Sequence, residues 1–124
     1  MGRSDISLRE TVVRNIKETG VLPCIKLHKK EDWVAYAQAM YDGGARLVEV
    51  TMTTPGALEA IEAISSHFKD RMWVASGTTL DVTSAREVIL RGGSCIVNPC
   101  VIPEVIDLGT RYGVPVLSGA APSQ

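Results

Sequence analysis

Short apolar runs alternate along the chain with stretches in which apolar residues recur every three or four positions. The first pattern is typical of buried strands and the second of amphipathic helices, and glycines and prolines mark the boundaries between them. A helix is expected within residues 1–20, capped by Ser4 or Asp5 and ended by Gly20. The later elements are expected as strands at 21–27, 46–51, 72–76, 94–97 and 114–117, and as helices at 31–42, 55–68, 81–90 and 102–111.

The expected strands begin about 20 to 26 residues apart, with a helix in each gap. Such βα units form a parallel sheet with right-handed crossovers. A dinucleotide-binding sheet would need a GxGxxG motif after its first strand, and the sequence has none. Polar residues instead collect just after the strands, where (βα)8 barrels hold their active sites.

We therefore expect an α/β fold of the TIM-barrel family, present as its N-terminal part. A complete barrel takes at least about 200 residues, so a chain of 124 residues provides about four βα units and a fifth strand. The expected organisation is a single domain over 1–124, with an N-terminal helix at 1–20, βα units at 21–118 and a tail at 119–124.

Composition excludes several classes of protein. The chain is 45% hydrophobic and 22% charged, which is enough for a folded core. A net charge of −1 without a basic tract argues against nucleic-acid binding, and no apolar run is long enough for a membrane span. The three cysteines have no metal-ligand spacing, and their odd number, with no secretory signal, predicts a reducing cytoplasm. We expect Cys24 and Cys95 in the core and Cys100 as an inert thiol, and no metal or cofactor.

Glu49 is the strongest candidate for chemistry, because it interrupts the apolar strand at 46–51. Alternation along a strand places Glu49 and Thr51 on one face, while the valines on either side of Glu49 pack under the helices. A partly desolvated carboxylate facing the barrel interior should have a raised pKa, which suits general acid–base catalysis. The alternative is a structural glutamate paired with Lys26 or Arg46.

Two other positions at the ends of strands could contact a substrate. Lys26 follows the first strand and could bind a carboxylate or phosphate; the alternative is a solvated lysine. Gly77 and Thr78 follow the third strand and offer backbone N–H groups and a hydroxyl where glycine permits close approach. The other interpretation of this segment is a turn that caps the helix beginning near Asp81, and one segment can serve both purposes.

Four ordered motifs then resemble one family over essentially the whole chain from residue 21 onward. Segment 43–51 (GGARLVEVT) is similar to the pattern GG-x-x-x-(L/I/V)-E-(V/I)-T. Segment 75–78 (ASGT) resembles GAGT, and segment 96–99 (IVNP) resembles (I/V)-(V/I)-S-P. Segment 115–124 (PVLSGAAPSQ) resembles P-x-x-P-G followed by T-P-(T/S)-E. These are motifs of the 2-keto-3-deoxy-6-phosphogluconate aldolase family.

The resemblance implies a homotrimeric class I aldolase that needs no metal and acts on a small keto acid. Such enzymes cleave a 2-keto-3-deoxy (phospho)sugar acid, or 4-hydroxy-2-oxoglutarate, to pyruvate and an aldehyde through a lysine Schiff base on the sixth strand. The resemblance makes Glu49 the proton-transferring residue and Thr78 a ligand of the pyruvoyl carboxylate. The remaining candidates for substrate binding are Lys26, Thr51, Thr53, Gly77 and Pro99.

The chain also departs from the family pattern. Thr53 stands where many members carry arginine, and Lys26 stands where some carry one. Asn98 replaces the serine of the fourth-strand motif, and Ser118 replaces a proline. The K-x-F-P segment with the Schiff-base lysine should lie roughly two dozen residues beyond Gln124, so we expect the 124-residue chain alone to be inactive.

Two alternatives remain at this point. One is a non-catalytic half-barrel that assembles with a partner chain or with a second copy, since its open sheet edges should be covered. The other is a different barrel enzyme, a phosphosugar isomerase or decarboxylase, but the Asp-x-Lys pair typical of those enzymes is absent from this sequence.

Overall fold

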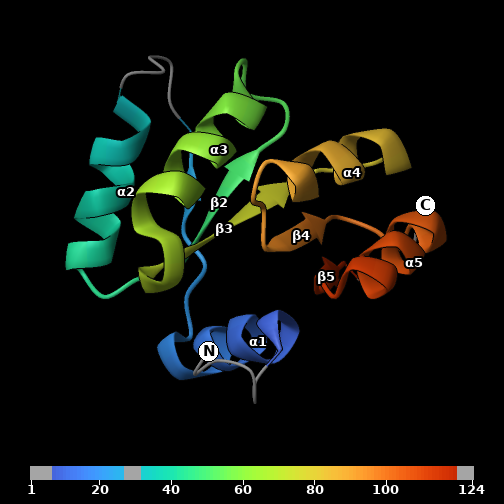
Figure 1. Ribbon diagram of the computed structural model, residues 1–124, viewed down its shortest axis with the longest axis horizontal. Coiled ribbons are helices and arrows are strands. Elements are labelled where there is room, and N and C mark those ends of the chain that lie inside the picture. Colours follow the sequence, from blue (N-terminus) through green and yellow to red (C-terminus); the bar gives the residue numbers. More distant parts are fainter. Residues whose placement is uncertain (1–6, 27–31, 120–124) are drawn as a thin grey trace.

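In the part of the chain that the structure describes, five strands form one parallel sheet in the order in which they occur along the sequence (Figure 1). The computed structural model describes residues 7–26 and 32–119. The strands are β1 (Cys24–Ile25), β2 (Leu47–Thr51), β3 (Trp73–Gly77), β4 (Cys95–Asn98) and β5 (Val116–Ser118). Because the strand order never reverses, the sheet is wound in one direction, which confirms the predicted βα architecture.

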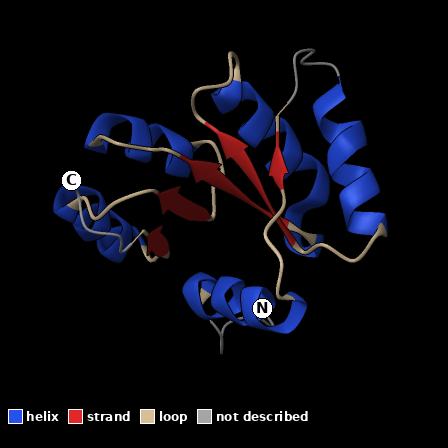
Figure 2. Ribbon diagram, turned by 180° about the vertical axis from the view of Figure 1, so that it is seen from behind, coloured by secondary structure: helices blue, strands red, loops and turns tan. Residues whose placement is uncertain are grey.

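A helix occupies each gap between consecutive strands, as the hydrophobic pattern predicted (Figure 2). The helices are α1 (Leu8–Thr19), α2 (Trp33–Asp42), α3 (Ala57–Phe68), α4 (Val82–Leu90) and α5 (Pro103–Tyr112), with a 3-10 turn, η3 (Lys69–Arg71), after α3. Each helix in the described parts of the chain is too short or too polar to cross a bilayer.

Helices α2 to α5 cover one face of the sheet, which we call the outer face. Val48 and Val50 of β2 are buried there against Ile61 and Ile64 of α3. The two valines that flank Glu49 therefore pack under the helices, as the alternation along the strand predicted.

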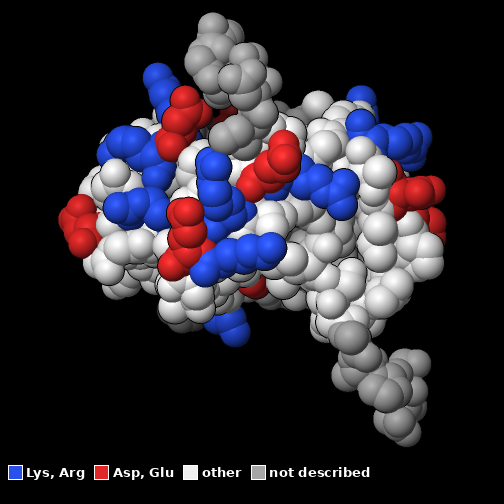
Figure 3. Space-filling model, turned by 90° about the horizontal axis from the view of Figure 1, so that it is seen from below, with Lys and Arg blue, Asp and Glu red and all other residues white. Residues whose placement is uncertain are grey.

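Helix α1 lies apart from the other helices and packs against the opposite, inner face (Figure 1). Its buried Val12 shares a core cluster with Leu47, Ala75 and Cys95. Leu47 and Cys95 are the first residues of β2 and β4, so α1 covers the amino-terminal ends of the strands. At the carboxyl-terminal ends of the strands, the inner face carries Glu49 and the loops around it. Acidic and basic side chains are interleaved on the molecular face seen from the side of α1 (Figure 3).

The predicted boundaries hold to within a few residues, with three differences. The first strand is shorter than predicted, Cys24–Ile25. Helix α1 is capped by Ser7, whose side chain accepts a hydrogen bond from the Glu10 amide at 3.1 Å; Ser4 and Asp5 lie outside the described residues. Helix α3 begins after Gly56 instead of at Pro55, because Gly56 has a φ of 77° and a Cβ there would lie 2.8 Å from the Trp33 ring.

Candidate active site at the carboxyl-terminal end of the sheet

Glu49 occupies the middle of β2, with its side chain on the inner face and half-buried. In the strand register it lies opposite Cys24 of β1 on one side and Ala75 of β3 on the other. The direction of the Glu49 side chain follows from the strand, because the two neighbouring valines pack against the helices on the outer face.

The carboxylate of Glu49 lies against Gly77, the last residue of the neighbouring strand β3. A Cβ on Gly77 would overlap Oε2 of Glu49, and would lie 2.7 Å from Cδ and 3.2 Å from Cγ of the same side chain. Gly77 does not have one of the positive φ angles found at other glycines, so its backbone conformation does not require glycine. Gly77 thus provides the space that the Glu49 carboxylate fills.

A thiol and a hydroxyl lie on the other side of the carboxylate. The Cys24 Sγ is 3.8 Å from Oε2 of Glu49 and 3.2 Å from Oγ1 of Thr51. The prediction that Cys24 lies in the core is wrong, because its side chain is exposed on the inner face beside Glu49, whereas Cys95 is buried as predicted. Cys24 is therefore a member of this site that the hydrophobic pattern did not indicate.

The environment of Glu49 raises the pKa of its carboxyl group above the ordinary value of 4.5. Burial is the main cause, and it is opposed by the hydrogen bond from Cys24 and by the positive charge of Lys26. The predicted direction is confirmed. Glu49 in turn affects Cys95, where burial, followed by the negative charge of Glu49, raises the pKa of the thiol to about 12.

Arg46, one of the two partners considered for a structural glutamate, is engaged elsewhere. Its guanidinium donates to the carbonyl oxygens of Tyr41 and Ala45, at 3.1 and 2.7 Å, and lies 4.2 Å from the centre of the Tyr41 ring. Lys26 is exposed and acts on Glu49 through its charge. Within residues 7–26 and 32–119, the ion pairs are those of Arg91 with acidic residues of α3 and α4, so Glu49 has none there.

The loop after β3 is held by a buried hydrogen-bond network. Thr78 has a φ of 58°, and its amide donates to the Val97 carbonyl at 2.8 Å. The Ser76 and Thr79 hydroxyls are 2.6 Å apart, and the Thr79 amide donates to Oδ1 of Asn98 at 2.6 Å. Asn98 therefore fixes the loop that carries Thr78, a role that the sequence analysis did not assign to it.

The helix after this loop has its own cap. The Asp81 side chain accepts from the Ser84 amide at 2.7 Å, and the pKa of Asp81 is lowered, first by this backbone hydrogen bond and then by the Ser84 hydroxyl. Gly77 and Thr78 are thus not needed to cap α4, which was the alternative reading of this segment.

The remaining predicted residues lie in exposed loops at the same end of the sheet. Thr53 follows β2 and Pro99 follows β4. The Pro99 carbonyl is packed against Gly119, where a Cβ would overlap it. The structure thus brings Glu49, Thr51 and Gly77 into one cluster, with Lys26 near enough for its charge to act on Glu49. Neither Thr53 nor Pro99 forms a hydrogen bond with Glu49 in the described parts of the chain.

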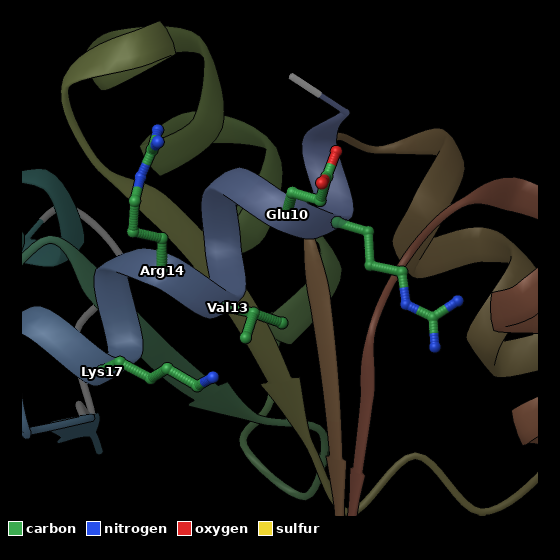
Figure 4. A pocket seen from close by; sticks show the side chains of 5 residues that line it. Glu10, Val13, Arg14 and Lys17 are labelled. Atoms are coloured by element: carbon green, nitrogen blue, oxygen red, sulfur yellow. The ribbon is translucent and has the colours of Figure 1, made fainter. Parts of the chain in front are cut away.

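An open hollow of about 380 Å³ lies at the other end of the molecule, on α1 (Figure 4). It is lined by Arg9, Glu10, Val13, Arg14 and Lys17. Arg14 and Lys17 point in different directions, and Glu10 forms the capping interaction with Ser7. The hollow lies outside the Glu49 cluster. The described residues also contain no group of three His, Cys, Asp or Glu side chains that could bind a metal ion.

Comparison with known proteins agrees with this geometry. A family model described as KDPG and KHG aldolase matches residues 12–124. The 2-dehydro-3-deoxy-phosphogluconate aldolase of Treponema pallidum is 34% identical over 111 residues, which cover 90% of this chain and 52% of that protein.

Two solved structures share the fold. A 4-hydroxy-2-oxoglutarate/2-dehydro-3-deoxyphosphogluconate aldolase from TTHB1 has a TM-score of 0.79 and 26% identity, over 89% of this chain and 54% of that one. The KDPG aldolase of Legionella pneumophila, captured with pyruvate as a covalent carbinolamine, has a TM-score of 0.75 and 28% identity, over 82% and 48%. The chain thus spans about half the length of these relatives. With nearly all of its residues matched by the family model, it belongs to the KDPG and KHG aldolase family.

Proposed function

We propose that this chain carries the acid–base part of an aldolase that cleaves a 2-keto-3-deoxy (phospho)sugar acid, or 4-hydroxy-2-oxoglutarate, to pyruvate and an aldehyde. The observation that supports it is the Glu49 carboxylate, half-buried on the inner face at the carboxyl-terminal end of the sheet, with a raised pKa and no ion pair among the described residues. A raised pKa makes this carboxylate a stronger base than an ordinary glutamate, which suits general acid–base catalysis.

In this proposal Glu49 carries protons to and from the substrate. When the carbon–carbon bond breaks, the hydroxyl of the departing aldehyde carbon loses its proton to Glu49, directly or through a water. The electron pair of the broken bond passes to an iminium formed between the substrate ketone and a lysine. From the family resemblance we expect that lysine in a K-x-F-P segment. None of the lysines of this sequence is in such a segment: Lys17, Lys26, Lys29, Lys30 and Lys69.

The substrate carboxylate and any phosphate need positive or N–H partners near Glu49. Lys26 is the cation whose charge reaches Glu49, and Thr53 stands where many family members carry arginine, so we assign anion binding on this side to Lys26. Thr78 and Gly77 would contact the pyruvoyl group, with Thr51, Thr53 and Pro99 completing the contacts.

The remaining parts of the proposal come from the resemblance and from composition. We propose a single domain over residues 1–124, a homotrimeric assembly, no cofactor, and a cytoplasmic location. The free thiols Cys24, Cys95 and Cys100 support the location, since disulfides are rare in that compartment.

The test is a chimera in which this chain is followed by the matching second half of the Treponema pallidum relative. We expect it to release pyruvate from 2-keto-3-deoxy-6-phosphogluconate or 4-hydroxy-2-oxoglutarate in a coupled lactate dehydrogenase assay. Glu49→Gln should lower kcat by about 100- to 10,000-fold, the usual contribution of general acid–base catalysis. Glu59→Gln, at an exposed position of α3, is the matched control. Full activity of Glu49→Gln would refute the assignment.

The chain by itself gives a second test. Incubated with pyruvate and borohydride, the 124-residue chain should form no covalent adduct detectable by mass spectrometry. An adduct would show that one of its own lysines forms the imine. The alternative of a non-catalytic half-barrel has no separate observation in its favour; a chimera that folds but releases no pyruvate from either substrate would revive it.

A further inference from the structure

Cys24 lies directly opposite Glu49 in the register of β1 and β2, at a position the family resemblance leaves without a role. Its sulfur lies within hydrogen-bonding distance of two groups, the Glu49 carboxylate at 3.8 Å and the Thr51 hydroxyl at 3.2 Å. A sulfur atom can donate through its S–H and accept at its lone pairs, both weakly. An ionised carboxylate accepts only, so the thiol must be the donor in its contact with Glu49.

We propose that Cys24 is a positioning residue for Glu49: its thiol donates a hydrogen bond to the carboxylate and accepts one from the Thr51 hydroxyl. The proposal rests on the proposed role of Glu49 as acid–base residue. Both neighbouring strands then fix the Glu49 carboxylate: Gly77 of β3 leaves the space that the carboxylate fills, and Cys24 of β1 donates a hydrogen bond to it from the other side.

The weakness of the thiol as a donor is what makes it suitable. An arginine or lysine in contact with Glu49 would stabilise the anion strongly and hold the pKa of the carboxyl group low. A thiol fixes the orientation while opposing the effect of burial only in part, so the pKa of Glu49 stays raised. The other groups facing Glu49 are Lys26 after β1, whose charge lowers its pKa, and the buried thiol of Cys95 on β4.

The decisive experiment compares Cys24→Thr with Cys24→Val in the 124-residue chain. The two side chains have nearly the same shape, and only threonine can donate a hydrogen bond, so packing is matched between them. The Glu49 carboxyl carbon is followed by ¹³C NMR against pH. We expect the pKa of Glu49 to be higher in Cys24→Val than in the unaltered chain, and lower in Cys24→Thr than in Cys24→Val.

Cys100→Val is the control, because Cys100 is also exposed but lies after β4, and it should leave the titration of Glu49 unchanged. Equal pKa values of Glu49 in Cys24→Val and Cys24→Thr would overturn the proposal, since the hydrogen bond would then have no effect. Thr51→Val adds a check on the second contact, and should raise the pKa of Glu49 less than Cys24→Val does.

A kinetic readout separates this proposal from the proposed function. In the chimera, the acidic limb of the kcat profile should move to higher pH in Cys24→Val and should return toward its original position in Cys24→Thr. If the NMR titration shifts as expected while the kcat profile does not, Cys24 positions Glu49 but Glu49 is not the acid–base residue. If the NMR titration does not shift, Cys24 has no positioning role, whatever the chimera catalyses.

Discussion

The contact between Glu49 and Gly77 can be tested by placing a methyl group in the space that the carboxylate fills. In Gly77→Ala the new Cβ would overlap Oε2 of Glu49, so either the side chain of Glu49 must rotate away or the two strands must separate. Both changes cost free energy of folding, because Glu49 is half-buried on the inner face and β2 is paired with β3 over its whole length. Overpacking of this kind costs about 1 to 3 kcal/mol.

The magnitude follows from a double-mutant cycle with Glu49→Ala, which removes the group that the methyl overlaps. Gly77→Ala should cost about 2 kcal/mol when Glu49 is present and close to zero when it is absent, giving a coupling energy of about 2 kcal/mol. With a urea slope of about 2 kcal/mol per molar, the single variant should unfold at a urea concentration about 1 M lower. The assay is urea unfolding followed by far-UV circular dichroism on all four proteins.

Gly43→Ala provides the matched control for this cycle. A Cβ on Gly43 would find its nearest neighbours at 3.5 and 3.6 Å, which is ordinary contact, and its φ is −80°. Its effect on stability should be the same with and without Glu49. If Gly77→Ala costs as much in the Glu49→Ala background as in the unaltered chain, overlap with the Glu49 carboxylate is not the cause of the destabilisation.

Three further predictions concern the surroundings of the same site. Because burial raises the pKa of Glu49, the folded protein holds this proton more tightly than the unfolded chain does. Ionising Glu49 therefore destabilises the fold: this cost is absent below the ordinary pKa of 4.5 and reaches its full size above the folded pKa. Glu49→Gln should accordingly become more stabilising as pH rises from 4 toward 7 in urea unfolding, and a pH-independent difference would contradict this. Asn98→Ala should cost about 1 to 3 kcal/mol in the same assay, because it leaves the buried Thr79 amide without the acceptor it has at 2.6 Å, and a loss well below that range would argue against the bond. Burial and the Glu49 charge raise the pKa of Cys95 to about 12, so a maleimide at pH 7 should label the exposed Cys24 and leave Cys95 unmodified when the digest is analysed by mass spectrometry.

The fold could be predicted closely because local chemistry marks nearly every boundary. Gly20 and Gly113 end their helices in the left-handed conformation, with φ values of 72° and 71°. The error at the start of α1 was avoidable, since Ser7 and Glu10 have the spacing of a capping box and form both of its hydrogen bonds. The error at the start of α3 could not have been avoided from the local sequence. Glycine is required at position 56 because a Cβ there would overlap the ring of Trp33, which lies in a distant segment of the chain.

The site was predictable where it depends on one strand and not where it depends on two. The inward direction of Glu49 follows from alternation within β2 alone. The contact between the Glu49 carboxylate and Gly77 depends on the register between β2 and β3, and the periodicity of one strand does not give that register. Cys24 was missed because an apolar run suggests burial on both faces, whereas β1 is only two residues long and leaves its inner face exposed at Cys24.

Two of the departures from the family pattern lie on β4 and β5, whereas Glu49 lies on β2. Asn98 and Ser118 are partners in the register of β4 and β5, so these two departures are neighbours in space. Each also has a buried polar atom, Nδ2 and Oγ, without a hydrogen-bond partner in the described parts of the chain. Through Oδ1, Asn98 holds the loop that carries Thr78, whereas Glu49 and Gly77 keep the family residues and touch neither departure. In the proposed function, Glu49 transfers the proton and the loop that carries Thr78 contacts the substrate. Under that proposal, these two departures would alter which keto acid is bound and leave the proton transfer unchanged.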